Sequence, residues 1–390
     1  MKFKRIFVLV LDSLGVGEAL DAASYGDSGA NTLKHIMENY DLFIPNLKKL
    51  GFTNTLTMED SNEVDAYYTI ARPNNKGKDS VAGHYEIFAL PLEEAFVDFD
   101  NSPFPLELIE KIEASTKERI IGNKVTNAQS ILEELGERHL SYGALILFSS
   151  ADSSLEIAAH EDIIPLPKLY KYCEIIRKIT ADNPKWRVSR VVARPFKGKI
   201  NNFKFTSNRK DYVIRPNKKT IFDELKQIGL DVISIGKITD IFAGEGITKI
   251  VNARKSNIDT LTKLADIMQK NFEGLCVTNL NDFDENYGHT RDLEGYAKSI
   301  EELDVEIPML LNKLSGDDLF IMTADHGCDP SLDGFTHTRE NVPVIIFSRN
   351  FKEPKKIEVL ETMADIGASI ADNFDLDAPP IGKSFLDKLN

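Results

Sequence analysis

Cysteine is scarce in this sequence of 390 residues. The three cysteines, Cys173, Cys276 and Cys328, lie far apart and form no CxxC pair. Such spacing gives no disulfide framework and is typical of a reducing compartment. We therefore expect a cytoplasmic protein.

Long apolar runs are also missing. No stretch approaches the roughly 20 apolar residues that cross a bilayer, so we expect no membrane partner. The run from Ile6 to Leu11 is short, and Asp12 ends it where a signal peptide would need small residues for cleavage. We expect this run to be a buried strand.

Positive charge is in deficit. The 47 lysines and arginines face 61 aspartates and glutamates, for a formal net charge of -14. This balance argues against general nucleic-acid binding, which needs a basic face. It would also repel a phosphate-bearing substrate unless the site brings its own positive charge, and bound metal ions are one source.

The pattern that is present predicts an α/β fold. With 42% hydrophobic and 28% charged residues the chain has a globular composition, and its length favours two domains. Short apolar runs alternate with helical periodicity, which predicts a mostly parallel sheet flanked by helices. The runs are residues 6–11, 231–236, 275–280, 319–324 and 342–347. Their carboxyl ends should share one edge, where open α/β sheets bind ligands.

The middle of the chain lacks these polar strand ends. Residues 98–217 open on the turn-rich DFDNSPFPLE and close on IRPNKK, both natural boundary sequences. Two helical patterns and two strand-like runs, GALILF and VSRVVA, lie between them. We predict a discontinuous catalytic core, residues 1–97 and 218–390, with a smaller α+β domain, 98–217, inserted into it.

Acids and histidines follow several predicted strands. They are Asp12, Asp284, His289, Asp325, His326 and His337. Any one alone is an ordinary cap or turn residue. The adjacent Asp325 and His326 can reach one centre only where the chain turns, and we assign that turn to Gly327. Six such residues on one sheet edge predict a metal site.

The ligand types indicate two transition-metal ions. Mixed carboxylates and imidazoles suit Mn²⁺ or Zn²⁺ better than Ca²⁺. Two ions about 4 Å apart can clamp the attacking and leaving oxygens of an in-line phosphoryl transfer. The set therefore predicts a two-metal phosphotransfer centre.

A serine is the candidate nucleophile. Ser80 lies between Gly77 and Gly83 in NNKGKDSVAGHYE, and its hydroxyl could be activated for attack. The same composition is also that of an ordinary polar turn. His84 has two interpretations as well, since it could orient this loop or fill a buried, hydrogen-bonded position.

The chain resembles bacterial phosphopentomutases of the alkaline phosphatase superfamily over nearly its whole length. The matching motifs are VLVLDSLGVGEALDA, GKDSVAGHYEI, SSADSSLEIAAHEDIIP, VARPFKG, FTSNRKD, IGKITDIFAGEGI, TNLNDFDENYGHTRD, TADHGCDPSLDGFTHTRE and IGKSFLDKL, in that order. The resemblance implies an alkaline-phosphatase-like core with an inserted cap domain.

The resemblance also implies residue roles. One metal ion, expected to be Mn²⁺, would be held by Asp284, His289 and His337, and a second by Asp12, Asp325, His326 and Ser80, with Ser80 carrying the phosphoryl group. Asp152 and Arg194 would lie near the sugar and its phosphate, and Arg209 and Lys237 at the phosphate that is not transferred. Surface ion pairing is the ordinary alternative for these four residues.

Several positions depart from the family pattern. The family usually has threonine where this chain has Ser80, then further threonines and a His-Trp pair, whereas this chain has Val81, Ala82 and His84-Tyr85. An aromatic residue expected near the start of the insert is missing, and DAYYTIARPNN is irregular. These changes leave the metal site intact and leave the sugar substrate open.

The implied activity is that of an isomerase in nucleoside catabolism. It would interconvert ribose 1-phosphate, or 2-deoxyribose 1-phosphate, with the 5-phosphate through a phosphoserine, and a sugar bisphosphate would act as activator. Two alternatives stay open: another phosphomutase, a phosphatase or a phosphodiesterase of the superfamily, and a catalytically weak sugar-phosphate-binding protein. We expect a monomer or a weak homo-oligomer.

Overall fold

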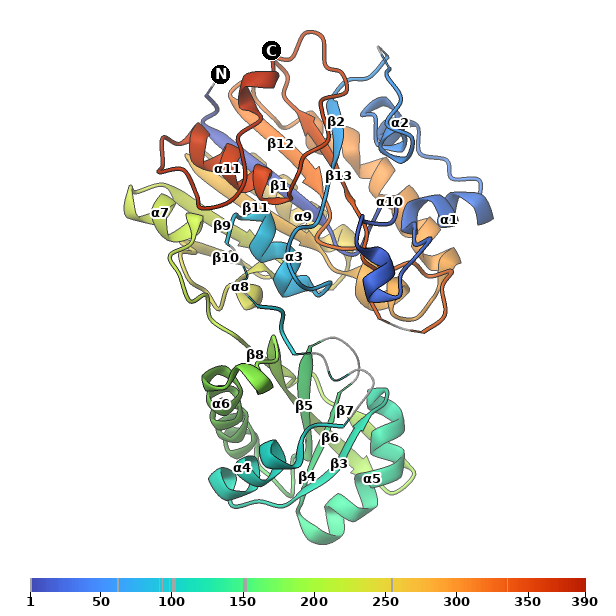
Figure 1. Ribbon diagram of the computed structural model, residues 1–390, viewed down its shortest axis with the longest axis vertical. Helices are drawn as coiled ribbons and strands as arrows, with labels where there is room; N and C mark the ends of the chain where they lie inside the picture. The colour runs from blue at the N-terminus through green and yellow to red at the C-terminus, as the bar shows by residue number, and fades with distance from the viewer. Residues whose placement is uncertain are drawn as a thin grey trace. The chain divides into compact units, whose positions relative to one another are not determined.

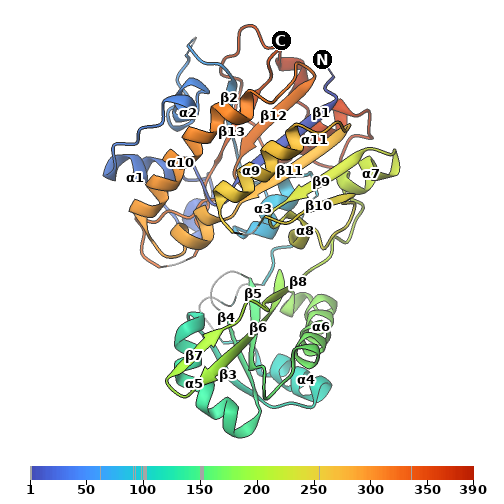
Figure 2. The same cartoon turned by 180° about the vertical axis from the view of Figure 1, so that it is seen from behind.

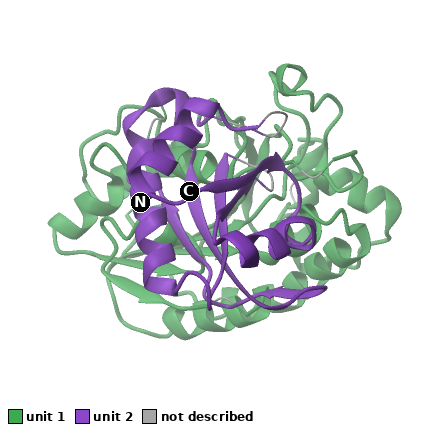
Figure 3. Ribbon diagram, turned by 90° about the horizontal axis from the view of Figure 1, so that it is seen from below, with its two compact units in different colours: residues 1–95, 216–390 green, residues 96–215 purple. Residues whose placement is uncertain are grey.

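The computed structural model describes residues 2–61, 63–90, 92, 94–97, 99, 103–149, 153–253, 255–334 and 336–390. The chain forms two compact units, which we call the core unit (residues 1–95 and 216–390) and the insert unit (residues 96–215; Figure 3). The expected insert, 98–217, is offset from the insert unit by two residues at each end. Within the described residues, no helix is both long enough and apolar enough to span a bilayer.

A seven-stranded sheet forms the centre of the core unit. Its strands are β1 (Arg5–Leu11), β2 (Tyr67–Ala71), β9 (Asp231–Ile235), β10 (Lys249–Val251), β11 (Gly274–Leu280), β12 (Asp318–Thr323) and β13 (Val342–Phe347), in the order β10-β9-β11-β1-β12-β13-β2. The first five in this order are parallel, and β13 is antiparallel to both β12 and β2. The predicted α/β fold with a mostly parallel sheet is confirmed, although the run 342–347 is an antiparallel strand.

Helices cover both faces of this sheet. They are α1 (Thr32–Asn39), α2 (Pro45–Lys49), α3 (Ser80–Ile87), α7 (Ile221–Gln227), α8 (Ile238–Ile241), α9 (Asn257–Met268), α10 (Leu293–Leu311) and α11 (Ala364–Asn373), with short helical turns at Ala22–Tyr25, Thr53–Leu56, Phe283–Gly288 and Leu386–Lys388. Figure 1 shows α3 and α11 on one face, and Figure 2 shows α9 and α10 on the other. All seven residues of β1 are buried, as a strand covered on both faces requires.

The insert unit has its own mixed sheet. Its strands are β3 (Ile120–Val125), β4 (Leu145–Ser149), β5 (Ser154–His160), β6 (Arg190–Lys199) and β7 (Asn202–Phe205), in that order, with β8 (Lys210–Val213) also paired to β6. Its helices are α4 (Leu106–Thr116), α5 (Ala128–Tyr142) and α6 (Leu166–Asp182), with a short turn at Pro184–Trp186.

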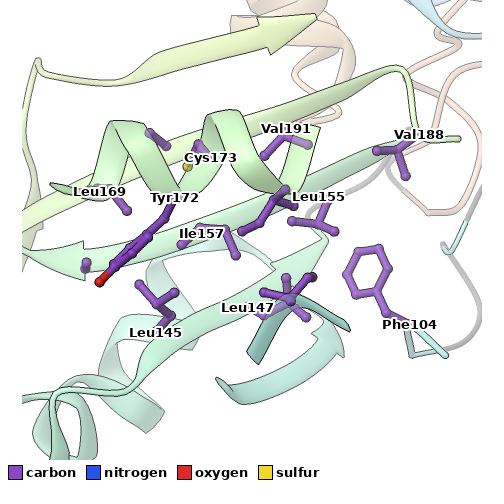
Figure 4. Close-up of a cluster of buried hydrophobic side chains, with 14 of the residues drawn as sticks. Phe104, Leu145, Leu147, Leu155, Ile157, Leu169, Tyr172, Cys173, Val188 and Val191 are labelled. Carbon is purple, nitrogen blue, oxygen red and sulfur yellow. The ribbon is translucent and has the colours of Figure 1, made fainter. Parts of the chain in front are cut away.

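Alternation along β4 gives the insert unit two apolar clusters. Leu145 and Leu147 pack with residues of α4 and α6 on one side of the sheet, as Figure 4 shows for part of that cluster. Ile146 and Phe148 pack with residues of α5 on the other. Successive strand residues point to opposite faces, so one strand supplies both clusters.

Candidate metal centre and nucleophile

The register of three parallel strands brings the acidic residues together. Strand β1 lies between β11 and β12, with Leu11 aligned to Leu280 and Val10 aligned to Thr323. The chain therefore leaves the sheet at the same level from three neighbouring strands. Asp12, Asp284 and Asp325 all lie in the segments that follow directly. This is the edge where open α/β sheets bind ligands.

The first group of side chains surrounds Ser80. Its Oγ lies 2.9 Å from Asp325 Oδ2, 3.0 Å from His326 Nε2 and 3.4 Å from Asp12 Oδ1. Lys237 Nζ lies 2.7 Å from the same Oγ and forms an ion pair with Asp12. Asp12, Asp325 and His326 have ligand atoms close enough together to hold one metal ion.

The second group adjoins the first. His337 Nε2 lies 3.2 Å from Asp284 Oδ1, and His289 Nε2 lies 3.4 Å from Asp284 Oδ2. The rings of His326 and His337 stack with their centroids 3.8 Å apart, which joins the two groups. The structure thus brings all six predicted ligands together beside Ser80.

The orientation of the imidazoles fits metal ligation. His337 Nδ1 faces the Lys78 carbonyl at 2.9 Å, and His326 Nδ1 faces the Gly327 carbonyl at 3.1 Å. These contacts keep a proton on Nδ1 and turn Nε2, the ring atom that is free to bind a metal ion, toward carboxylates. Asp284 is only 6% exposed, and its Oδ1 faces His337 Nε2. A positive charge held between these rings and the buried carboxylates, as a proton or as metal ions, balances their charge, and two divalent ions fit this donor set.

The electrostatics of the centre reflect its buried carboxylates. Burial and the charge of Asp325 raise the pKa of Asp12. Burial would also raise the pKa of Asp325, but His326 and His84 hold it well below its usual range. Burial acts to lower the pKa of His326, yet Asp325 and the neighbouring acids raise it to about 10. Without metal the centre therefore retains a proton that a bound cation would displace.

Ser80 begins a helix and does not lie in an open turn. It is the first residue of α3, and the Asp79 carboxylate accepts from the amides of Val81 and Ala82 as the N-cap. Every residue of α3 is buried. A Cβ on Gly83 would lie 2.1 Å from the Asp325 carbonyl oxygen, so only glycine lets this helix pack against the segment of the predicted ligand Asp325.

His84 fulfils both of its interpretations. The ring is fully buried, and its Nδ1 lies 2.8 Å from the Ser80 carbonyl oxygen and 3.1 Å from Asp325 Oδ2. Its Nε2 contacts Asn279 Oδ1, and Asn279 in turn donates to Asp12. His84 therefore links the nucleophile segment to both carboxylates of the first group.

Gly327, to which the turn beside Asp325 and His326 is assigned, does not have a positive φ. Close packing explains why this residue is a glycine, because a Cβ at this position would lie 2.3 Å from Oε1 of the buried Glu340. The left-handed residue is Ser13, directly after Asp12, with φ of 69°. Its amide donates to Asp325 Oδ1, so the strained turn orients the carboxylate of a predicted ligand.

The four predicted substrate contacts have different placements. Lys237 Nζ lies 2.7 Å from Ser80 Oγ, the predicted nucleophile. Arg194 and Arg209 belong to the insert unit, where Arg194 pairs with Glu156 at 3.1 Å and Arg209 pairs with Asp211 at 2.9 Å. Asp152 lies outside the described residues.

Sequence reasoning missed Arg339, which holds the segment before Ser80. This arginine is 3% exposed. Its guanidinium donates to the carbonyls of Pro73, Asn75 and Gly77 and to the Asp21 carboxylate. The available signal was a charged residue in THTRE, next to the ligand His337.

Comparison with known proteins places the chain in a family. The family model described as the Metalloenzyme superfamily matches residues 4–378. The solved PH0037 protein from Pyrococcus horikoshii is 12% identical, with a TM-score of 0.49 over 96% of this chain and 97% of that one. A Leishmania mexicana phosphoglycerate mutase is 11% identical, with a TM-score of 0.48 over 98% and 97%. A Vibrio parahaemolyticus protein in the alkaline phosphatase superfamily is 14% identical, with a TM-score of 0.46 over 99% and 70%.

Sequence identities of 11–14% and TM-scores below 0.5 are too low to indicate the activity of this chain. The family model is the stronger finding because it spans nearly the whole sequence, including every predicted metal ligand. The chain therefore belongs to the Metalloenzyme superfamily.

Proposed function

We propose that the chain is a metal-dependent phosphomutase that interconverts ribose 1-phosphate, or 2-deoxyribose 1-phosphate, with the 5-phosphate through phosphorylated Ser80. The observation that carries the proposal is the position of Ser80 Oγ, within 3.0 Å of Asp325, His326 and Lys237. Divalent cations, which we propose to be Mn²⁺, would supply positive charge at the transferred phosphoryl group when bound by the six ligands.

Lys237 stabilises negative charge at the nucleophile. Its ammonium lies 2.7 Å from Ser80 Oγ, so it can stabilise the serine oxygen as it loses its proton and then the oxygens of the phosphoryl group. The amino terminus of α3 favours negative charge at the same place. The amides of Val81 and Ala82 already donate to Asp79. Stabilisation of the negative charge on the phosphoryl oxygens therefore falls to Lys237 and the cations.

Burial of the nucleophile favours a mutase over a hydrolase. Ser80 is 8% exposed, and Asp12, Asp325 and His326 are 4% exposed or less. Low exposure restricts the access of water to a phosphoserine at this position, and attack by water would release free phosphate. We propose that Asp152, Arg194 and Arg209 bind the sugar and its second phosphate, and that a sugar bisphosphate phosphorylates Ser80 at the start.

The test supplies ribose 1-phosphate, Mn²⁺ and a trace of glucose 1,6-bisphosphate to the purified chain. We expect ribose 5-phosphate to form and intact-protein mass spectrometry to find one phosphate, located on Ser80. Ser80→Ala should lose at least about 10,000-fold in turnover, as expected for a nucleophile, while keeping its metal affinity.

Other outcomes would select the alternatives. Release of free phosphate without ribose 5-phosphate would indicate a phosphatase. Turnover of a different sugar phosphate would indicate another phosphomutase. Tight sugar-phosphate binding with no phosphate ever found on Ser80 would indicate a binding protein and would refute the mutase.

A further inference from the structure

Cys328 lies in different surroundings from the other two cysteines. Cys173 belongs to an apolar cluster of the insert unit and Cys276 to the buried strand β11, and burial raises the pKa of both thiols. Cys328 is equally buried, but Arg291 Nη1 donates to its Sγ at 3.2 Å. The Cys328 thiol in turn donates to the Thr336 carbonyl at 3.7 Å, so this sulfur lies among polar groups.

The backbone holds Cys328 against the second group of metal ligands. Its amide donates to the Ser13 carbonyl at 3.0 Å and to Thr32 Oγ1 at 3.2 Å. Opposite the sulfur, Gly288 ends the helical turn Phe283–Gly288. A Cβ on Gly288 would lie 3.1 Å from Sγ, closer than side chains normally pack. Glycine at this position lets the sulfur approach the turn that carries Asp284.

The sulfur lies within ligand range of two predicted metal ligands. A carboxylate oxygen of Asp284, a ring nitrogen of His289 and Cys328 Sγ all lie within 4.8 Å of one another. Asp284 is buried, and its two oxygens face the ring nitrogens of His337 and His289 at 3.2 and 3.4 Å. The cluster thus contains a buried carboxylate whose charge a cation would balance.

The donor types separate soft cations from hard ones. A set of thiolate, imidazole and carboxylate suits Zn²⁺ and Co²⁺, whereas Mn²⁺ prefers oxygen and nitrogen. We propose that Cys328 is an additional ligand on the Asp284–His289 side of the centre, used by Zn²⁺ and Co²⁺ and not by Mn²⁺. On binding, the thiol loses its proton to solvent and a metal–sulfur bond forms. This inference rests on the metal centre of the proposed function but not on the identity of the sugar.

The test is the absorption spectrum of the full chain titrated with Co²⁺. The wild-type protein should develop a thiolate-to-cobalt charge-transfer band in the near ultraviolet. Cys328→Ser should lose this band yet retain the weaker visible bands of bound Co²⁺, and Cys276→Ala should keep both. In Cys328→Ser the Zn²⁺ affinity should fall about tenfold or more, and the Mn²⁺ affinity less than about threefold.

Thermal unfolding in the presence of a chelator, repeated with Cys328→Ala, checks that both variants fold. Bound Co²⁺ without a charge-transfer band in the wild type, or a band that persists in Cys328→Ser, would overturn the sulfur ligand and leave the metal centre standing. No Co²⁺ binding at all would overturn the metal centre, and the proposed function with it.

Discussion

The histidines of the two units have different buried neighbours. All five histidines of the core unit contact a carboxylate at 2.6–3.4 Å. The pairs are His35 with Asp329, His84 and His326 with Asp325, and His289 and His337 with Asp284. In the insert unit, His139 Nδ1 donates to the Ala144 carbonyl and its Nε2 accepts from the His160 amide. His160 Nε2 lies 3.1 Å from the Gly198 carbonyl, and its Nδ1 lies 3.9 Å from the carboxylate of the exposed Asp162.

The difference shows that the neighbours of a buried histidine decide its charge. Burial acts to lower the pKa of His326, but the acids around it raise this pKa to about 10. Burial lowers the pKa of His139, and the histidine stays neutral between backbone groups. A proton or metal ion thus belongs to the histidine cluster of the core unit, whereas the insert unit uses the same residue type to complete its fold.

The sharpest test of this comparison replaces one histidine in each unit. His337→Asn removes a predicted ligand, and we expect turnover and Mn²⁺ affinity to fall at least about 100-fold with little change in metal-free unfolding. His139→Asn should leave Mn²⁺ affinity unchanged and cost about 1–3 kcal/mol of stability, because it leaves buried backbone groups unpaired. Calorimetric Mn²⁺ titration and thermal unfolding measure both. Equal metal losses in the two variants would break the comparison.

A second test compares two buried arginines of the core unit, one beside the Ser80 segment and one at the amino end of β1. It asks whether turnover depends on the arginine near Ser80 in particular. Arg339→Lys keeps the charge but has three donors in place of five, so it cannot bond the three carbonyls and the Asp21 carboxylate together, and the segment before Ser80 should loosen. We expect kcat to fall about 10- to 100-fold with Mn²⁺ affinity unchanged.

The matched control for Arg339 lies at the amino end of β1. Arg5 is also buried, and it donates to Asp318 and to the carbonyls of Met268 and Lys270. Arg5→Lys should reduce stability and leave kcat near the wild-type value. An Arg339→Lys enzyme with full kcat would show that this clamp is dispensable.

A third test compares two closely packed glycines, one in each unit. Gly83→Ala would place a Cβ 2.1 Å from the Asp325 carbonyl oxygen, and Gly136→Ala would place one 2.4 Å from the Phe203 ring in the insert unit. Each overlap should cost about 1–3 kcal/mol of stability. Only the Gly83 variant should also lose Mn²⁺ affinity, because α3 is displaced from a ligand segment. Titration of folded protein decides the point, and unaltered binding in Gly83→Ala would contradict it.

The smallest expected effect is the pH dependence of the insert unit. Burial lowers the pKa of His139 below its ordinary 6.5, so the unfolded chain binds the proton more readily than the folded chain does. Stability from this residue is therefore complete above about pH 6.5 and lost as pH falls below it, by at most about 1.4 kcal/mol per pH unit. Hydrogen exchange of residues 128–149 at pH 7 and pH 5 measures this loss. His139→Gln should reduce the difference between the two pH values, and an unchanged difference would assign it to other groups.

Much of the core unit could be predicted from the sequence. Strands buried on both faces must be continuously apolar, so β1, β11 and β12 stand out as runs. Acids and histidines directly after such runs are conspicuous because the chain there reaches a sheet edge. The direction of β13 was not predictable in this way, since a buried strand has the same apolar character in either direction.

The groups that act through contacts between distant segments could not be predicted. Arg339 holds a segment more than 250 residues earlier in the chain, and Lys237 meets Ser80 across 157 positions. Gly327 is a glycine because of Glu340, not because of its own backbone angles. No local sequence pattern predicts these residue pairs, because only the packing of the folded chain brings their members together.

The sequence by itself determined the fold class, five of the seven strands of the core sheet and the acids and histidines expected at one edge, since hydrophobic periodicity and residue chemistry are local properties. Only the tertiary structure decided that β1 lies between β11 and β12, that Lys237 faces the nucleophile and that Cys328 lies beside Asp284. These contacts depend on the order of the strands and on close packing at Gly83 and Gly288. Both are determined by residues that lie far apart along the chain.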